Sequence, residues 1–324
     1  MGSNTVDAFV ETDADLISIK HGEKDLEEIL GYRYGEKILI NKLEFKVGGS
    51  ATNAAVSFSR LGHDTAYLGK IGEDNNGVKV YQTLKDEGID FVGSSGDETG
   101  YSVILDSEYE DRTILTYKGC NNDLRFDELD MDELETDWFF FTTMMEESFR
   151  TMKILSKKLD EQDVKIAFNP SSYLATKGFE KCEPILKHVN VLILNEEEAK
   201  SLAKKEDLGE TLKTLKDHVK DYVIVTSGGD GAYLYDENTV YVGKPSDRDI
   251  VETTGAGDAF ASGFISGLIN EDDIETSFKK GFIQAEAVIQ EYGAKTGLLQ
   301  EEEINERIHH DSRDIQQKDV EEIT

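Results

Sequence analysis

Short apolar runs rich in β-branched and aromatic residues alternate with amphipathic stretches along most of this chain of 324 residues. The apolar runs lie at residues 6–10, 65–72, 138–143, 164–170, 189–195 and 221–229. The stretches 53–62 and 77–88 have helical patterning, and each ends at a glycine, which is favourable just past a helix. This alternation predicts βαβ units, and therefore an α/β fold with a doubly wound, largely parallel sheet. Ligands of such sheets bind beyond the carboxyl ends of the strands.

Three regions depart from this rhythm and have the pattern of antiparallel strands: residues of about 14–24, 33–47 and 99–118. The third region has a turn near residues 107–111 between two alternating β runs, which is typical of a hairpin. We expect these strands to form a small sheet beside a single main domain that spans residues 1–310. Residues 311–324 are expected to form an acidic C-terminal tail, either a surface helix or a frayed end.

The charge of the chain limits its partners. The 67 acidic residues outnumber the 35 basic ones, giving a formal net charge of −32, and they are spread along the whole chain. A field of this sign repels duplex nucleic acid and anionic membranes, so we expect neither as a partner. Disorder is one explanation of so high a charge. The regular apolar runs favour instead a folded protein with a halophilic acidic surface, on which high salt screens the self-repulsion.

Cysteine content and hydropathy indicate a soluble, cytoplasmic protein. Cys120 and Cys182 are the only cysteines and form no CxxC pair, so neither a disulfide framework nor a cysteine metal site is expected. The first residues lack the basic and apolar segments of a signal peptide. No uninterrupted apolar run approaches the ~18 residues that a membrane-spanning helix needs.

Residues 252–264, ETTGAGDAFASGF, combine a glycine turn, a helix start and a carboxylate. Gly255 and Gly257 allow a tight turn, and Asp258 opens an apolar helix. Because the N–H groups at a helix start point outward, with the positive end of the helix dipole behind them, the turn suits a phosphoryl group in transfer. Asp258 would then accept the proton of an attacking hydroxyl. The alternative is a plain strand-to-helix turn in which the dipole merely favours Asp258.

Three further stretches carry polar residues beside glycines or strand ends, and each has a purely structural alternative. In VGGSATN, Gly49 allows a ligand to approach the backbone and Asn53 offers a donor and an acceptor to hydroxyls; the alternative is a simple glycine turn. In NEEEA, Asn195 and Glu198 share one face of a helical turn and suit a hydrated Mg²⁺; the alternative is a helix cap. Residues 226–235, TSGGDGAYLY, either contact a nucleotide or close a hairpin.

In this order and spacing, the four stretches resemble the PfkB (ribokinase-like) family of carbohydrate and nucleoside kinases. TTGAGDAFASGF is similar to the C-terminal signature of that family at nearly every position, and GGSATNAAVSFSRLG resembles its N-terminal signature. NEEEA resembles its N-x-x-E motif, and TSGGDG its nucleotide-side glycine turn. The likeness covers residues from about 5 to 298. It implies a ribokinase-like α/β/α sandwich with a small β-sheet lid, and transfer of the γ-phosphoryl group of ATP to a hydroxymethyl group of a sugar.

The resemblance also implies roles for individual residues. Asp258 would be the base, and the N–H groups of Gly255, Ala256 and Gly257 would stabilise charge on the phosphoryl oxygens. Glu198 would organise Mg²⁺ through water. The implied ATP-binding residues are Asn195, Thr226, Gly228 and Gly231, and the implied sugar-binding residues are Asp15, Gly49 and Asn53. A monovalent cation, K⁺, would bind near Glu252 and the loop 293–297, and a homodimer would form through the lid.

Two positions depart from the family pattern. The residue before the signature threonines is usually Asp, and here it is Glu252, whose longer side chain puts a potassium requirement in doubt. The N-terminal pattern G-x-x-N-x-D, matched to residues 10–15, keeps Asp15 but has Val10 for Gly and Asp13 for Asn. The added carboxylate of Asp13 disfavours a phosphorylated sugar by charge repulsion.

Two other functions stay open on the same fold. A nucleoside kinase would use the same machinery, with Tyr101, Ile104 and Tyr117 flanking a base. A non-catalytic sugar or nucleotide sensor is less favoured, because Asp258 and its glycine turn are intact.

Overall fold

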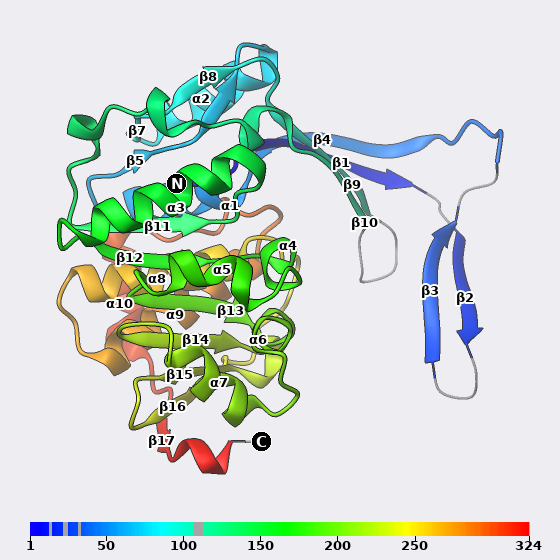
Figure 1. Ribbon diagram of the computed structural model, residues 1–324. Coiled ribbons are helices and arrows are strands. Elements are labelled where there is room, and N and C mark those ends of the chain that lie inside the picture. The colour runs from blue at the N-terminus through cyan, green and yellow to red at the C-terminus, as the bar shows by residue number, and fades with distance from the viewer. Residues whose placement is uncertain (13–14, 22–24, 32–33, 107–112, 324) are drawn as a thin grey trace.

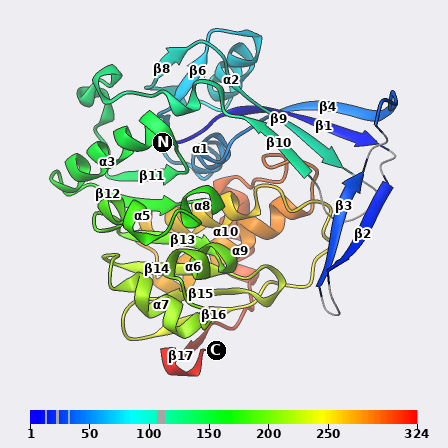
Figure 2. The ribbon, with the colours of Figure 1, turned by 45° about the vertical axis from the view of Figure 1, so that its right-hand side comes forward.

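A computed structural model describes residues 1–12, 15–21, 25–31, 34–106 and 113–323; between residues 15 and 31, and at Thr12 and Asp106, only the backbone is described. The chain forms a central sheet between two layers of helices, and a second sheet projects from one side of this sandwich (Figures 1 and 2).

Within the described residues, the central sheet has seven strands in the order β11-β12-β13-β14-β15-β16-β17. Strands β11 to β14 are parallel, whereas β15, β16 and β17 are antiparallel. The middle strands are apolar and buried on both faces, as parallel strands between two helix layers must be. The predicted α/β sandwich is therefore confirmed, with an antiparallel edge that the alternation did not indicate. The strands are β11 (Trp138–Thr142), β12 (Lys165–Asn169), β13 (Val191–Asn195), β14 (Tyr222–Thr226), β15 (Ala232–Tyr235), β16 (Val240–Gly243) and β17 (Gln316–Lys318).

One helix layer contains α3 (Glu146–Asp160), α4 (Ser172–Ala175), α5 (Phe179–Leu186), α6 (Glu196–Ala203) and α7 (Leu208–Lys216). The other contains α1 (Ser50–Arg60), α8 (Ala256–Ile269), α9 (Ile274–Ile289) and α10 (Glu301–His310) (Figure 1). Edge-to-face contacts among Phe260, Phe264, Phe278 and Phe282 hold α8 against α9. Because this packing fixes α8, it also fixes where the first turn of α8 points.

The projecting sheet is the lid, with strand order β10-β9-β1-β4. Its strands are β1 (Thr5–Thr12), β4 (Ile40–Gly48), β9 (Gly100–Asp106) and β10 (Thr113–Tyr117), and the hairpin of β2 (Asp15–His21) and β3 (Asp25–Gly31) lies beyond it (Figure 1). Two of the three regions expected in the lid supply its strands β4, β9 and β10, whereas the region of about 14–24 contributes β2 to the separate hairpin with β3. β1 joins the lid instead of opening the central sheet, pairing parallel with β9 and antiparallel with β4.

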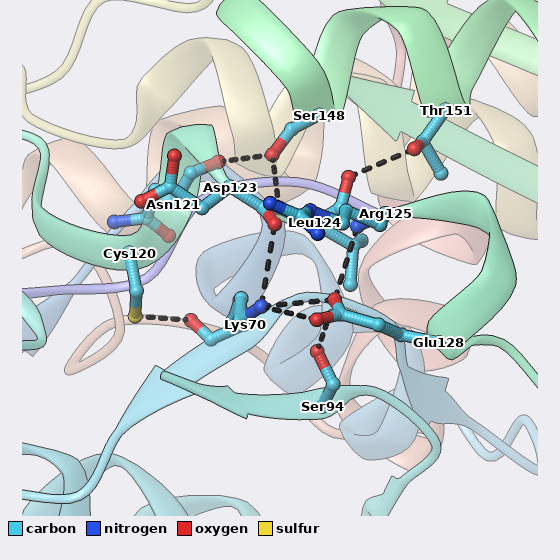
Figure 3. Close-up of polar contacts among 10 residues, drawn as sticks. All are labelled: Lys70, Ser94, Cys120, Asn121, Asp123, Leu124, Arg125, Glu128, Ser148 and Thr151. Atoms are coloured by element: carbon cyan, nitrogen blue, oxygen red, sulfur yellow. Dashed lines mark hydrogen bonds and ion pairs between the residues drawn. The ribbon is translucent and has the colours of Figure 1, made fainter. Parts of the chain in front are cut away.

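Residues 65–96 form short strands around α2 (Asn75–Asp86), and the single strand expected at 65–72 is divided. The strands are β5 (Ala66–Tyr67), β6 (Lys70–Gly72), β7 (Asp90–Phe91) and β8 (Ser94–Gly96). After β10 the chain leaves the lid, and a polar cluster holds its residues 120–128 against the region of short strands (Figure 3). In it the buried Lys70 ammonium contacts both oxygens of Glu128, at 2.6 and 2.9 Å, and Ser148 bonds the carbonyl of Asn121 and the N–H of Leu124.

The C-terminal segment is not the separate tail that its composition suggested. Gln316–Lys318 adds β17 to the edge of the central sheet by pairing with β16. Val320 and Ile323 are buried in the core beside α7. Apolar residues are sparse in this acidic segment, so its sequence alone does not indicate burial. They are buried because the segment pairs with the edge strand β16.

Candidate active site

The first turn of α8 carries the predicted base. Gly255 caps this helix with φ of +81°, and a Cβ at this position would lie 2.5 Å from the Cβ of Ala294, so glycine is required there. The N–H of Ala256 donates to the carbonyl of Thr253, at 3.2 Å. Within the described part of the chain, the N–H groups of Gly255 and Gly257 have no acceptor, and Gly257 faces open space. Two of the three predicted anion-binding N–H groups are therefore available to a ligand.

Asp258 lies in this turn and is linked to two other segments. Its Oδ2 accepts a hydrogen bond of 2.8 Å from Nδ2 of Asn53, on α1. The Oδ1 of Asn53 in turn accepts from the ammonium of Lys295, which also donates to the carbonyl of Val47, at 2.7 Å. The structure thus joins Asp258 and Asn53, which were both predicted, to Lys295, which was not.

Burial raises the pKa of Asp258 to about 6, while the hydrogen bond from Asn53 and the charge of Lys295 act in the opposite direction. Burial lowers the pKa of Lys295 to about 8, against the pull of Asp7 and Asp258. Between these values Asp258 is a carboxylate and Lys295 an ammonium. A carboxylate with a pKa near neutrality is suited to accept a proton.

The glycines of the N-terminal signature let three segments approach closely. Gly49 caps α1 with φ of +98°, and a Cβ there would lie 2.5 Å from the carbonyl oxygen of Ser3. A Cβ on Gly48 would lie 1.8 Å from Oδ2 of Asp7, so this carboxylate sits directly on the glycine pair. Gly49 and Asn53 are therefore next to each other at the start of α1, as predicted.

Asp7 is the second site residue that sequence reasoning missed. Its Oδ1 is buried without a hydrogen-bond partner among the described residues, and burial raises its pKa. The signal was present: Gly2 and Asp7 have the same separation as the Gly and Asp of G-x-x-N-x-D, with Thr5 at the Asn position. Asp15, which was matched to that Asp, begins β2 in the outer hairpin, and its side chain lies outside the described residues, as does all of Asp13. Its sugar-binding role stays a prediction.

Asn195 and Glu198 form a capping box at the start of α6. Oδ1 of Asn195 accepts from the N–H of Glu198, at 2.8 Å, and Oε2 of Glu198 accepts from the N–H of Asn195, at 3.1 Å. The structural alternative for these residues is therefore present. Glu198 is 9% exposed, and burial raises its pKa. The negative charge of Glu198 in turn raises the pKa of Asp258.

Thr226 ends β14 directly beside Asn195 in the register of β13 and β14. The turn that follows closes the hairpin of β14 and β15, as the structural alternative for TSGGDG predicted. Within it, positions Gly228 and Gly229 face open space, whereas Gly231 packs against the carbonyl of Gly243. Thr226 and Gly228 therefore lie at the carboxyl edge of the sheet with room for a ligand, while Gly231 shapes the turn.

Glu252 ties the signature segment to the loop 293–297. Its Oε2 accepts from the N–H of Gly293, at 2.7 Å, and the hydroxyl of Thr254 donates to its Oε1. The two segments expected around a monovalent cation do meet. At least one donor already faces each oxygen of the carboxylate.

Among the described residues, no group of three or more His, Cys, Asp or Glu side chains is arranged to hold a metal ion. Within the same residues, no helix is both long and apolar enough to cross a membrane.

Comparisons with known proteins agree with this geometry. Residues 14–301 match the model of the pfkB family of carbohydrate kinases. An uncharacterized sugar kinase of Archaeoglobus fulgidus is 30% identical over 246 residues, which cover 75% of this chain and 98% of the relative. An ATP-dependent ribose-1-phosphate kinase of Halopiger xanaduensis is 29% identical over 236 residues, which cover 72% of this chain and 76% of the relative. The ribokinase structure from Thermotoga maritima matches with a TM-score of 0.80 at 21% identity, over 96% of this chain and 98% of that one.

The fold is therefore ribokinase-like, and the predicted family is confirmed. Because the family model matches residues 14–301, a range that includes the glycine turn at the start of α8, this chain belongs to the pfkB family of carbohydrate kinases, which are phosphotransferases that act on an alcohol group.

Proposed function

We propose that this protein transfers the γ-phosphoryl group of ATP to a hydroxymethyl group of a free sugar, with Asp258 as the base. The observation that carries the proposal is the position of Asp258. Its carboxylate lies in the first turn of α8, beside two backbone N–H groups that have no acceptor among the described residues, and accepts a hydrogen bond from Asn53. Base and anion site therefore meet at one point.

In this mechanism the carboxylate of Asp258 accepts the proton of the sugar hydroxyl as the hydroxyl oxygen bonds to the γ-phosphorus of ATP. The bond between that phosphorus and the bridging oxygen breaks, and ADP leaves. The N–H groups of Gly255 and Gly257 face the phosphoryl oxygens, where charge develops in transfer. Phosphoryl transfer depends mainly on such positioning and electrostatics. The glycine turn after β14, with Thr226 and Gly228, is placed to take the nucleotide.

Mg²⁺ bound with ATP supplies positive charge to the phosphates. The residues present suit a contact through water. Each oxygen of Glu198 already faces one donor, Ser172 at Oε1 and the N–H of Asn195 at Oε2, and keeps further acceptor capacity. A hydrated ion suits a single carboxylate of this kind better than direct coordination would.

The sugar site is proposed at Asp7, Gly49 and Asn53. The buried Oδ1 of Asp7 lacks a donor among the described residues, and a sugar hydroxyl would satisfy it. The same carboxylate disfavours a phosphorylated sugar, although a relative is a ribose-1-phosphate kinase. We therefore place a free sugar first and test sugar phosphates as competitors.

The lid supports a sugar better than a nucleoside. Tyr101 and Tyr117 are paired in the register of β9 and β10, so their side chains share one face of the lid, whereas Ile104 points to the other face. Tyr101 packs against the core and Ile104 is 3% exposed. These three residues do not flank one base, so a nucleoside kinase is the second candidate.

The test is ATP turnover against free sugars, sugar phosphates and nucleosides, assayed in molar KCl because of the acidic surface. We expect a free sugar to be the best acceptor. Asp258→Asn should lower kcat by a factor of about 10³ or more while ATP still binds, and Asp86→Asn, at an exposed position of α2, is the matched control. Near-normal turnover by Asp258→Asn would refute the role of the base. Ligand binding without turnover on any acceptor would favour the sensor.

Two further properties belong to this proposal. A homodimer would form through the lid face that carries Leu43, Phe45 and Leu115, each about half exposed. A potassium requirement would be weak, because Glu252 already accepts from Gly293 and Thr254. Repeating the assay in NaCl at equal ionic strength separates a need for K⁺ from a need for salt.

A further inference from the structure

Lys295 is the residue of the active site that the proposed mechanism leaves without a role. It lies in the loop 293–297, far in sequence from β4 and α1, yet its ammonium reaches three acceptors at the end of β4 and in the first turn of α1. These are the carbonyl of Val47 at 2.7 Å, Oδ1 of Asn53 and, at 3.3 Å, the hydroxyl of Thr52. A protonated lysine has three N–H donors, so these acceptors use all of them.

We infer that Lys295 is a positioning residue for the base, which orients the amide of Asn53 toward Asp258 and keeps Asp258 ionised near neutral pH. The inference rests on the proposed function, in which Asp258 accepts the proton.

The orientation follows from the chemistry of the amide. Asn53 has one end that accepts and one that donates, and the ammonium of Lys295 bonds only an acceptor. Holding Oδ1 on Lys295 therefore leaves Nδ2 facing Asp258, at 2.8 Å from Oδ2. Without the ammonium, the amide could turn over and present its oxygen to the carboxylate, which would repel it.

The loop that carries Lys295 is held by contacts that do not involve its side chain. The guanidinium of Arg60 donates to the carbonyls of Lys295, at 2.8 Å, and of Leu298, at 3.3 Å, while it pairs with Glu87. The ammonium of Lys46 bonds the carbonyl of Tyr292, at 2.7 Å. We therefore expect the loop to keep its course when the Lys295 side chain is replaced.

The charges around the pair explain why one lysine matters. Asp258 faces the positive charge of Lys295 and the negative charge of Glu198 from α6, and Ser50 is a further hydrogen-bonding partner. Lys295 faces Asp7 from β1 and Asp258 from α8, and the ion pair of Arg60 and Glu87 also acts on it, with smaller effects. Burial raises the pKa of Asp258, and Lys295 is the first charged group that opposes this rise. Its removal leaves burial and Glu198 unopposed by a nearby cation.

The experiment measures kcat against pH for the full-length protein and its variants. The wild type should lose activity as pH falls through about 6, the pKa of Asp258. Lys295→Met should move this midpoint upward by about one pH unit, because a nearby cation lowers the pKa of a carboxylate by about that much or more. Its kcat at pH 6.5 should fall by about threefold from this shift, and Lys295→Arg should restore most of the activity and the midpoint. Lys157→Met, at a 66% exposed position of α3, is the control.

A merely structural role for Lys295 would lower activity equally at every pH and leave the midpoint in place, which would overturn the inference. If Lys295→Met unfolds, Lys295→Gln is used instead. The ¹³C titration of the Asp258 carboxyl, with its signal assigned by comparison with Asp258→Asn, then gives the midpoint of Asp258 without a turnover assay. A titration midpoint unchanged in Lys295→Gln would also overturn it. If Asp258→Asn keeps its activity, the proposed base fails as well. If Asp258→Asn is inactive and the midpoint of the Lys295 variants does not move, only the inference fails.

Discussion

Asp258→Asn should make the folded protein more stable at neutral pH while it abolishes catalysis. The substitution removes a negative charge and changes little else, because the amide oxygen of the new side chain can still accept the hydrogen bond from Asn53. Burial raises the pKa of Asp258 from 3.8 to about 6, so the folded state binds its proton more tightly than the unfolded chain does. Ionising Asp258 therefore costs the folded protein free energy that the unfolded chain does not lose.

The sign fixes the pH window. Below about pH 4, Asp258 is protonated in both states and the wild type carries no penalty. As pH rises from about 4 to 6, the unfolded chain ionises first, and the wild type loses stability that Asp258→Asn retains. The shift of about two pKa units corresponds to about 3 kcal/mol at most. Because Asp258 is half-buried and the variant also leaves Lys295 without its partner, we expect a gain of ~1–2 kcal/mol at pH 7.

The assay is urea unfolding of wild type and Asp258→Asn in the same high-salt buffer at pH 4 and pH 7. The free energies of unfolding should agree within about 0.5 kcal/mol at pH 4 and differ by ~1–2 kcal/mol at pH 7, where Tm should rise by roughly 2–4 °C. Groups away from the site titrate alike in both proteins, so the difference between the two pH values reports the charge of Asp258 and its effect on Lys295. An equal gain at both pH values, or a loss at pH 7, would refute the reasoning that burial of the charge destabilises the fold.

Two further predictions concern the surface. Light scattering should give about twice the monomer mass of 36.2 kDa, and Leu43→Asp with Phe45→Asp should give the monomer, because a charge on this lid face opposes its burial; a monomeric wild type would argue against the lid dimer. The thermal unfolding temperature should rise between 0.1 and 2 M KCl, because the screening length falls from ~10 Å to below ~3 Å while the chain carries a charge of −32. A flat or falling curve would contradict a halophilic surface.

The sheet and the main site segments were predictable because each has a local signal. The strands that end at Thr142, Asn169, Asn195 and Thr226 are short apolar runs between amphipathic stretches, and the glycines before Asp258 and Asn53 mark tight turns at helix starts. The antiparallel edge was not predictable in this way, because β15 and β16 follow a hairpin turn whose sequence also suits a nucleotide loop. β17 has only three residues, and its pairing depends on an edge formed far earlier in the chain.

Asp7 and Lys295 escaped prediction for different reasons. Residues 2–7 keep the spacing of G-x-x-N-x-D, but the pattern was matched to residues 10–15 instead. Asp7 lies inside an apolar strand, and its role depends on β1 entering the lid sheet so that its carboxylate meets Gly48. Lys295 lies in a loop of small residues, and nothing near it in the sequence shows that its side chain will reach Asn53. A residue whose partner is more than 200 positions away leaves no periodic trace.

Lys295 and Asp258 also show why neither residue can be assessed alone. Burial moves the pKa of Asp258 up to about 6 and that of Lys295 down to about 8, so each residue would be closer to neutral without the other. Asn53 lies between them: its Oδ1 accepts a hydrogen bond from Lys295, and its Nδ2 donates one to Asp258. A base held by burial alone would be protonated near neutral pH, and one fully exposed would be too weak to accept a proton. The three-residue chain places Asp258 between these limits, which is where a general base acts best.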